Sequence, residues 1–562
     1  MKLSGAEIAV KCMEKEGVQV VFGIPGGTIM PLYDAMHRIA SFKNILTKHE
    51  QGAVHAADGY ARASGGVGVC LVTSGPGATN TVTGIAAAYT DSIPLVVLTG
   101  QVPTQLIGND AFQEVDIVGI TRPCTKHNYL VTRIEDIARI IKEAFHIAKS
   151  GRPGPVLVDL PKDLMSLTTR YKPPQEVKLE SYQPTYNPNA KQLHKVVGLI
   201  KKAKRPMVLA GGGVVLSKSS DGLTKFVKRI HAPIATTLMG LGVFPTKSRL
   251  WLGMIGMHGT YRANMSSAEC DLLIAIGVRF DDRVTGKTDE FAPNAKIVHV
   301  DIDPTSIRKN VPVSIPVVGD CKITLDLLNN LLDKEDFHGL DELREPWLGQ
   351  IDEWKNSKRL AYKQDKVIKP QYVIEKLYEL TRGEAVITTE VGQNQMWAAQ
   401  YYHFDSPNCF ITSGGLGCMG FGLPAAIGAQ IARPDKLVVD IAGDGSIQMN
   451  IQEMATAVHY NLPVKVVILN NRYLGMVRQW QELFYDKHYA CTSMEHAPDF
   501  LKLADAYGAA GLRATRPEEV EPVLKEGLSI PRTVIMEFVV EREESVYPMV
   551  PAGAPISEML LV

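Results

Sequence analysis

Short apolar runs recur along the chain, each bounded by glycine or proline and separated from the next by an amphipathic stretch of helical length. Uninterrupted apolar runs are typical of strands that are buried on both faces, as in parallel sheets connected by helices. The pattern therefore predicts an α/β protein with three doubly wound parallel-sheet domains. The predicted strands are residues 18–23, 67–73, 94–99 and 155–160, then 207–210, 233–237, 272–277 and 296–301, and finally 385–389, 410–413, 437–441, 464–469 and 533–539.

Polar stretches between these groups of strands predict the domain boundaries. A polar, proline-spaced segment is expected to be a linker, and a later charged segment a helix plus connector. We expect domains at 1–170, 189–335 and 370–562, with the linker at 171–188 and the connector at 336–369. The first and last domains share a short stretch of similar sequence, LVTSGPG in the first and FITSGGLG in the last, which a duplicated fold would explain.

Composition narrows the class of protein. The 562 residues are 45% hydrophobic and carry 60 basic against 60 acidic side chains, which excludes a disordered chain, collagen and a coiled coil. Balanced charge without a basic stripe argues against nucleic-acid binding. The eight cysteines form no C-x-x-C pair, so neither a zinc site nor a disulfide framework is indicated, and buried reduced thiols are expected.

The N-terminal sequence does not indicate export. The first residues contain no apolar stretch of the kind found in secretory signals, so a cytoplasmic protein is expected. Two uncharged windows, 67–90 and 406–432, are long enough to consider as membrane spans. Glycines interrupt both windows, and we interpret each as a strand, a turn and a buried helix.

Polar residues follow two consecutive predicted strands of the last domain. Gly443-Asp444-Gly445 comes after one, and Asn470-Asn471 after the next. Parallel strands bring their carboxyl ends to one sheet edge, where ligands bind in open sheets. A carboxylate beside an amide oxygen suits Mg²⁺, and the glycines allow phosphates to approach the backbone.

A second motif competes with this interpretation. Residues 415–420 read GLGCMG, the G-x-G-x-x-G pattern of dinucleotide-binding folds, and Asp440 follows twenty residues later. A flavin- or nicotinamide-dependent oxidoreductase is therefore an alternative, and a nucleotide-binding module without enzymatic activity is a third.

The segment 48–62 reads KHEQGAVHAADGYAR and predicts a helix. Glu50 then shares a face with Ala53, Val54 and Ala57, a stripe of small apolar residues. Partial desolvation would raise the pKa of such a carboxyl group and make it an effective proton partner near neutrality. Favourable interaction with the helix dipole is the simpler alternative.

Together these motifs resemble those of the thiamine-diphosphate-dependent enzymes. The stretches AFQEVDIVGITRPCTKH, GRPGPVLVDLPKD, RFDDRVTGK, GGLGCMGFGLPAAIGAQ and LGMVRQWQELFY narrow the resemblance to the acetohydroxyacid (acetolactate) synthase family, over essentially the whole chain. The resemblance implies a transferase that decarboxylates pyruvate and condenses the two-carbon unit with pyruvate or 2-ketobutyrate in branched-chain amino acid biosynthesis. Thiamine diphosphate supplies the electron sink that no side chain offers.

The resemblance also implies roles for individual residues. Glu50 would activate the coenzyme, Met419 would support its bent shape, Arg283 would bind the second keto acid and Trp480 would form a pocket wall. The implied Mg²⁺ ligands are Asp444, Asn471 and Tyr473, and the implied substrate-lining residues are Gln113, Phe112, Gly27 and Lys162. The implied diphosphate contacts are Gly392, Gln393, Asn394, Gly417, Gly445 and Ser446.

The middle domain is implied to bind FAD in a structural, non-redox role. Its expected contacts are Arg152, Gly211, Gly212, Gly213, His258, Gly259, Gly277, Arg279, Asp301, Ile302 and Asp320. Because Glu50 and Asp444 belong to different domains, the family likeness implies a homodimer or homotetramer with sites between subunits. It also implies a small regulatory subunit, and neither a nucleic-acid partner nor a membrane.

Overall fold

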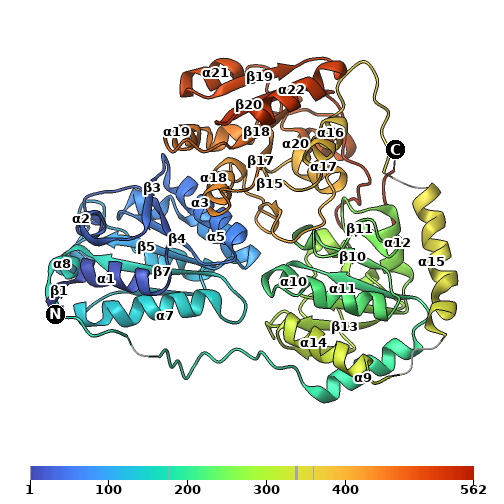
Figure 1. Cartoon of the computed structure of the whole chain (residues 1–562), viewed down its shortest axis with the longest axis horizontal. Helices are drawn as coiled ribbons and strands as arrows, with labels where there is room; N and C mark the ends of the chain where they lie inside the picture. The colour runs from blue at the N-terminus through green and yellow to red at the C-terminus, as the bar shows by residue number, and fades with distance from the viewer. Residues whose placement is uncertain (1, 175, 336–338, 358–359, 562) are drawn as a thin grey trace.

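Three six-stranded sheets form the framework of the chain, and within each sheet all paired strands are parallel (Figure 1). A computed structural model describes residues 2–174, 176–335, 339–357 and 360–561. All thirteen predicted strands are present. The predicted fold class, three doubly wound α/β domains, is confirmed.

The first sheet has the order β3-β2-β4-β5-β7-β6, and β1 pairs with β8 in a separate antiparallel pair. The strands are β1 (Lys2–Ser4), β2 (Val20–Gly23), β3 (Lys43–Leu46), β4 (Gly68–Val72), β5 (Leu95–Gln101), β6 (His127–Leu130), β7 (Pro155–Pro161) and β8 (Thr168–Arg170). The helices are α1 (Gly5–Lys15), α2 (Met30–Ile39), α3 (Glu50–Ser64), α4 (Pro76–Thr79), α5 (Val82–Asp91), α6 (Ile117–Thr121), α7 (Ile137–Lys149) and α8 (Lys162–Ser166). Residues 171–188, the predicted linker, contain no helix or strand among those described.

Alternating residues of the first sheet pack on opposite faces. On strand β4, Val69 and Leu71 face the core that α1, α2 and α7 cover, whereas Cys70 and Val72 face the core under α3 and α5. Side chains that alternate between two apolar layers explain why these strands read as unbroken apolar runs.

The middle sheet has the order β11-β10-β9-β12-β13-β14, which is the 3-2-1-4-5-6 order of dinucleotide-binding folds. Its strands are β9 (Pro206–Ala210), β10 (Ile234–Thr236), β11 (Trp251–Met254), β12 (Leu272–Ile276), β13 (Lys296–Asp301) and β14 (Ile315–Val318). Its helices are α9 (Ala190–Lys202), α10 (Gly212–Leu216), α11 (Ser220–Arg229), α12 (Tyr261–Glu269), α13 (Asp282–Thr285) and α14 (Cys321–Leu332). Helix α15 (Leu340–Ser357) lies in the predicted connector, of which residues 336–338 and 358–359 lie outside the described part of the chain.

The last sheet has the order β16-β15-β17-β18-β20-β19. Its strands are β15 (Val386–Thr389), β16 (Phe410–Ile411), β17 (Val438–Gly443), β18 (Lys465–Asn470), β19 (Ala510–Ala514) and β20 (Val534–Val539). Its helices are α16 (Pro370–Thr381), α17 (Gln393–Tyr401), α18 (Gly422–Ala432), α19 (Met454–His459), α20 (Gly475–Phe484), α21 (Phe500–Tyr507) and α22 (Pro517–Ser529). When the strands are numbered within each domain, the first and last sheets share the order 2-1-3-4-6-5. The short stretch of similar sequence in the two domains suggests the same likeness.

The first and last domains meet where α3 crosses α18 (Figure 1). Glycines occupy the closest points of this crossing. A Cβ at Gly59 would lie 2.2 Å from the carbonyl oxygen of Ala425, and one at Gly428 would lie 1.9 Å from that of Ala56. Only residues without a side chain allow the two backbones to approach this closely.

Within the described residues, no helix combines the length and the apolar character needed to cross a membrane. The two uncharged windows are instead a strand followed by helices, as predicted: β4, α4 and α5 for the first, and β16 and α18 for the second.

Candidate active site

A cavity of about 680 Å³ lies at the carboxyl end of the last sheet. Strands β17 and β18 pair directly, and each ends at this cavity. Asp444 follows the first strand and Asn471 the second, and both line the cavity. The strand ends therefore bring the two predicted oxygen ligands to one place, as the spacing predicts.

The Asp444 carboxylate is the most unusual group in the cavity. The residue is 1% exposed, and neither carboxylate oxygen has a hydrogen-bond partner. Burial raises the pKa of this carboxyl group to about 7. Asn471 is also buried, and its Oδ1 accepts a hydrogen bond of 3.1 Å from the Tyr473 N–H, which leaves a second lone pair. A buried carboxylate without donors is suited to a cation.

The remaining predicted diphosphate contacts also surround this cavity, and three of their side chains donate hydrogen bonds to other groups of the protein. The Gln393 amide donates to Gln479 Oε1 and the Glu544 carbonyl, and Asn394 Nδ2 donates to the carbonyls of Glu390 and Ile441. The Ser446 hydroxyl donates to Glu390 Oε2 at 2.7 Å. A phosphate would therefore meet backbone groups of these residues rather than their side chains. The predicted coenzyme contacts that line the cavity are Gly392, Gln393, Asn394, Gly417, Met419, Gly445 and Ser446.

The two residues predicted to recognise substrate lie together. The guanidinium carbon of Arg283 lies 5.7 Å from the centre of the Trp480 ring, a distance typical of a cation–π contact. The Arg283 side chain is 55% exposed and lines the cavity, so it can meet a ligand that enters. Trp480 Nε1 is buried and has no hydrogen-bond partner.

A second cavity of about 200 Å³ lies at the switch point of the middle sheet, between β9 and β12. Of the predicted FAD contacts it is lined by Arg152, Gly212, Gly213, Gly277, Arg279, Asp301, Ile302 and Asp320. Gly211 and Gly259 do not line it, and His258 lines the larger cavity instead. Burial raises the pKa of Asp301 to about 6. Arg279 lines both cavities, so the two adjoin.

The residues predicted from the first domain do not line the larger cavity of their own chain. Glu50 begins α3, and its Oε2 accepts a hydrogen bond of 2.9 Å from Asn80 Nδ2. Phe112 is 88% exposed, and Gly27 and Lys162 are exposed as well. Gln113 is half-buried. The described residues of one chain thus bring the predicted metal ligands together with Arg283 and Trp480, but not with Glu50 or the predicted substrate residues of the first domain.

The structure reveals buried acids to which sequence reasoning assigns no role. Glu390 accepts hydrogen bonds from the N–H groups of Gly420 and Leu423 and from Ser446, and burial raises its pKa. Glu453 accepts from the N–H groups of Lys48 and His49, directly before Glu50, at 2.9 Å each. An acid at the end of a predicted strand was the available signal for Glu390; nothing local in the sequence marks Glu453.

The G-x-G-x-x-G motif does not occupy a dinucleotide-binding position. It follows β16, an edge strand of the last sheet, and that sheet lacks the 3-2-1-4-5-6 order. The sheet with this order is the middle one, where the glycines after β9 and β12 line the second cavity. The motif is instead part of a turn in the wall of the larger cavity.

None of the eight cysteines forms a disulfide, as expected. Five are buried, and Cys124 and Cys409 are half-buried. Cys491 is exposed, in contrast to the expectation that the thiols are buried, because it lies in an irregular segment after α20 rather than in a sheet or a covering helix.

Comparison with known proteins matches all three domains to thiamine pyrophosphate enzymes. The model of the N-terminal TPP binding domain covers residues 3–120, that of the central domain 193–328, and that of the C-terminal TPP binding domain 390–538. The acetolactate synthase large subunit of Haemophilus influenzae is 49% identical, over 100% of this chain and 98% of the relative. Acetolactate synthase isozyme 3 large subunit of Escherichia coli is 50% identical over the same shares, and chloroplastic acetolactate synthase 1 of Nicotiana tabacum is 47% identical over 99% of this chain and 84% of the relative.

Proposed function

The chain belongs to the acetolactate synthase large subunits of the thiamine pyrophosphate enzymes, and we propose that it joins two 2-keto acids. The reaction decarboxylates pyruvate and condenses the remaining two-carbon unit with a second pyruvate or with 2-ketobutyrate. The products are 2-acetolactate and 2-aceto-2-hydroxybutyrate, precursors of the branched-chain amino acids.

The observation that carries this proposal is the Asp444 carboxylate, buried at the end of β17 with both oxygens free of hydrogen bonds. In this setting Asp444, the Asn471 carbonyl and the backbone carbonyl of Tyr473 would hold a Mg²⁺ ion. The glycine-rich turns at Gly392 and Gly415–Gly417 would lie against a diphosphate. When bound, thiamine diphosphate supplies the electron sink for decarboxylation.

The remaining groups bind and orient. Glu50 would hold the proton that activates the coenzyme; its carboxylate is already fixed by Asn80. Arg283 would bind the carboxylate of the second keto acid through two parallel hydrogen bonds, which orients the keto carbon. Trp480, beside Arg283, would form the wall that recognises the extra methyl group of 2-ketobutyrate, a contact worth about 1–3 kcal/mol.

We further propose that the site is shared between two chains, so that Glu50 of one subunit acts on a coenzyme held by the Asp444 of another. The exposed Phe112 and the absence of Glu50 from the larger cavity support this arrangement. The relatives are named as large subunits, which supports a small regulatory partner here as well.

FAD is proposed for the middle domain, with a structural role. Arg152 from the first domain and the acids at the ends of β13 and before α14 would hold it, in a cavity at the switch point of a dinucleotide-type sheet. The condensation of two keto acids transfers no net electrons, so the flavin has no redox step to perform.

The test is to incubate the enzyme with pyruvate, Mg²⁺ and thiamine diphosphate and to measure acetolactate with and without oxygen. Acetolactate formed equally in both supports the proposal, whereas peroxide or acetyl phosphate would identify an oxidase. Glu50→Gln should fold and bind coenzyme but exchange the thiazolium proton roughly a hundredfold to ten-thousandfold more slowly. Near-normal exchange measured by NMR would remove Glu50 from this role.

The shared site has its own test. A hybrid that pairs a Glu50→Gln chain with an Asp444→Ala chain places both lesions at one site and leaves the other intact. Two differently tagged chains, co-expressed and purified through both tags, yield this hybrid. About half of the normal activity is expected, although each variant alone is inactive. An inactive hybrid would argue that each chain forms its own site.

A further inference from the structure

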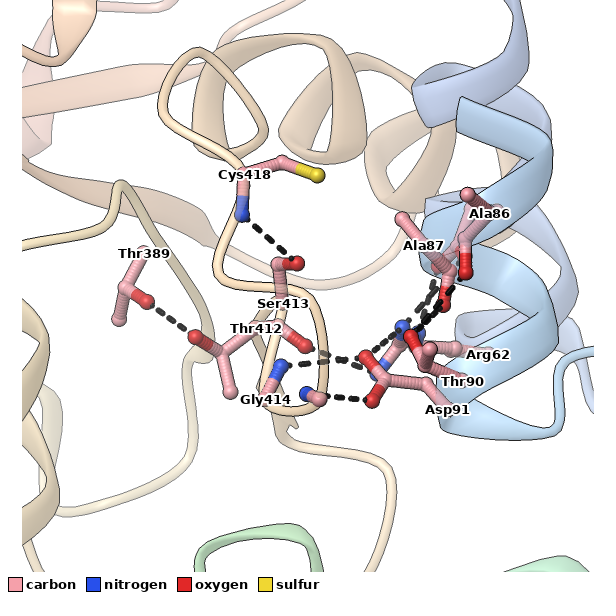
Figure 2. A network of polar contacts seen from close by, with 12 residues as sticks. Arg62, Ala86, Ala87, Thr90, Asp91, Thr389, Thr412, Ser413, Gly414 and Cys418 are labelled. Carbon is pink, nitrogen blue, oxygen red and sulfur yellow. Dashed lines mark hydrogen bonds and ion pairs between the residues drawn. The ribbon is translucent and has the colours of Figure 1, made fainter. Parts of the chain in front are cut away.

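A buried cluster of three charged residues lies in the first domain, against the last one (Figure 2). Arg62, in the last turn of α3, donates from Nε to Asp58 at 2.6 Å and from Nη2 to Asp91 at 2.9 Å. The side chains are 6%, 0% and 0% exposed in the order Arg62, Asp58 and Asp91. We call these three residues the Asp91 clamp.

The Asp91 clamp forms hydrogen bonds with a turn of the last domain. Asp91 accepts hydrogen bonds from two successive backbone N–H groups, from Gly415 to Oδ1 at 2.7 Å and from Gly414 to Oδ2 at 3.1 Å. Arg62 Nη1 donates to the Thr412 carbonyl at 2.9 Å, and its guanidinium lies 5.4 Å from the centre of the Phe421 ring. Figure 2 shows the helices of the first domain on one side and this turn on the other.

Charge balance explains why the turn is needed. Two carboxylates share one guanidinium, and a buried ion without full pairing costs free energy. The N–H groups of Gly414 and Gly415 supply the missing donors to Asp91. Replacement of buried ion pairs by well-packed apolar side chains is often neutral or stabilising, so stability alone does not account for three buried charges here.

The turn that the clamp holds is a wall of the larger cavity. Gly414 to Gly417 and Met419 line it. Within the turn the Cys418 N–H donates to Ser413 Oγ at 3.1 Å. This bond ties the two ends of the turn together, so we expect a shift at Gly414 to reach Met419. The contact at the clamp is close: a Cβ on Gly415 would lie 2.8 Å from Asp91 Oδ1 and 2.9 Å from Thr90 Cβ.

Helix α3 carries Glu50 in its first turn and Arg62 in its last turn, about 18 Å apart along a helix of 15 residues. We propose that Asp91, oriented by Arg62, is a positioning residue that sets the 414–419 turn against the coenzyme of its own chain. The same α3 would then present Glu50 to the coenzyme of the partner chain, so one helix serves two active sites. This inference rests on the proposed function and on its shared site.

The first experiment measures coenzyme affinity rather than turnover. Asp91→Asn removes the charge, and Gly415→Ala displaces the turn while every charge is kept. Both should weaken thiamine diphosphate binding to the apo-enzyme roughly tenfold or more, measured by quenching of tryptophan fluorescence in the presence of Mg²⁺. The double variant should weaken binding by less than the product of the two single effects, because both changes act on one contact.

Asp159→Asn is the matched control. Asp159 is another buried acid of the same domain, but its hydrogen bonds come from Thr99 and Gln101 and not from the turn. This variant should bind coenzyme normally. Circular dichroism and thermal melting of each apo-protein show whether a variant is folded, so that weak binding caused by a displaced turn is distinguished from weak binding caused by an unfolded domain. If Asp91→Asn does not fold, Gly415→Ala tests the proposal in its place. Unchanged coenzyme affinity in a folded Asp91→Asn and in Gly415→Ala overturns the proposal.

The second experiment tests which site the clamp serves. At a coenzyme concentration that saturates only the unchanged enzyme, a hybrid of Glu50→Gln and Asp91→Asn chains should recover about half of normal activity, because both lesions fall at one site. If the Glu50→Gln and Asp444→Ala hybrid recovers activity but this one does not, the clamp acts on the wrong site and the inference fails. If neither hybrid recovers activity, the proposal of a shared site is wrong, and the role of the Asp91 clamp is then decided by the affinity measurements alone.

Discussion

Replacing Gly428 by alanine tests the closest approach between the first and last domains. The new Cβ would lie 1.9 Å from the carbonyl oxygen of Ala56 in α3, where ordinary van der Waals contact begins near 3.4 Å. The obstacle is backbone rather than a flexible side chain. Helix α18 must therefore move away from α3 by about 1.5 Å, a shift that also loosens the neighbouring contact of Gly59 with Ala425.

Two opposing effects set the magnitude. Overpacking of this kind costs about 1–3 kcal/mol, and a clash with backbone belongs at the upper end. Alanine in place of glycine within a helix gains about 1 kcal/mol. The net loss is about 2 kcal/mol, which for a domain of this size lowers Tm by about 4–8 °C.

Scanning calorimetry on the apo-protein measures this change, with Gly198→Ala as the control. Gly198 lies in α9, and a Cβ there would meet nothing within 4 Å, so its substitution brings only the helical gain. We expect Tm to fall for Gly428→Ala and to stay level or rise by a few degrees for Gly198→Ala. Equal shifts in both variants would refute the view that the crossing requires glycine.

Three further predictions concern the site and its surroundings. Arg283→Ala should lower kcat/KM for the acceptor keto acid by roughly tenfold or more; an unchanged preference for keto-acid acceptors would remove its assignment. Chelation of Mg²⁺ should abolish coenzyme binding by calorimetry, and unchanged affinity would contradict the role of Asp444. Burial raises the pKa of Asp159 to about 7 from an ordinary 3.8, so the stability that its protonated form contributes is complete below pH 3.8 and is lost progressively as the pH rises to about 7. Relative to the unchanged protein, Asp159→Asn should therefore gain about 3 kcal/mol in the free energy of unfolding between pH 5 and pH 9, seen as a difference in Tm that widens with pH, and parallel Tm curves would contradict this.

The central strands were predictable because every position in them is buried, as in β4 and β12. Five strands of the three sheets were missed, and all are edge strands: β3, β6, β11, β14 and β19. Some edge strands mix polar with apolar residues, as in β3 (KNIL) and β6 (HNYL), and leave no apolar run to recognise, whereas β11 (WLGM) and β14 (IPVV) are apolar but only four residues long and contain a glycine or a proline.

The same distinction applies to the site. Asp444 and Asn471 could be placed together because neighbouring parallel strands fix where their ends lie. Asp91 could not be paired with Gly414, since the two are 323 residues apart and meet only through the packing of two domains. No local pattern encodes such a contact. The roles of Glu50, Arg283 and the other site residues stay predictions until the variants above are measured.

The exposed thiol of Cys491 is a site for attaching a fluorescent label. The other seven cysteines are buried or half-buried, so a maleimide fluorophore should label this position selectively without any engineered substitution. Its neighbour Thr492 accepts a hydrogen bond from the Leu474 N–H at the start of α20, the helix that carries Trp480. Emission from a dye at Cys491 would therefore follow movements of the cavity wall in real time, in the unmodified sequence and during turnover.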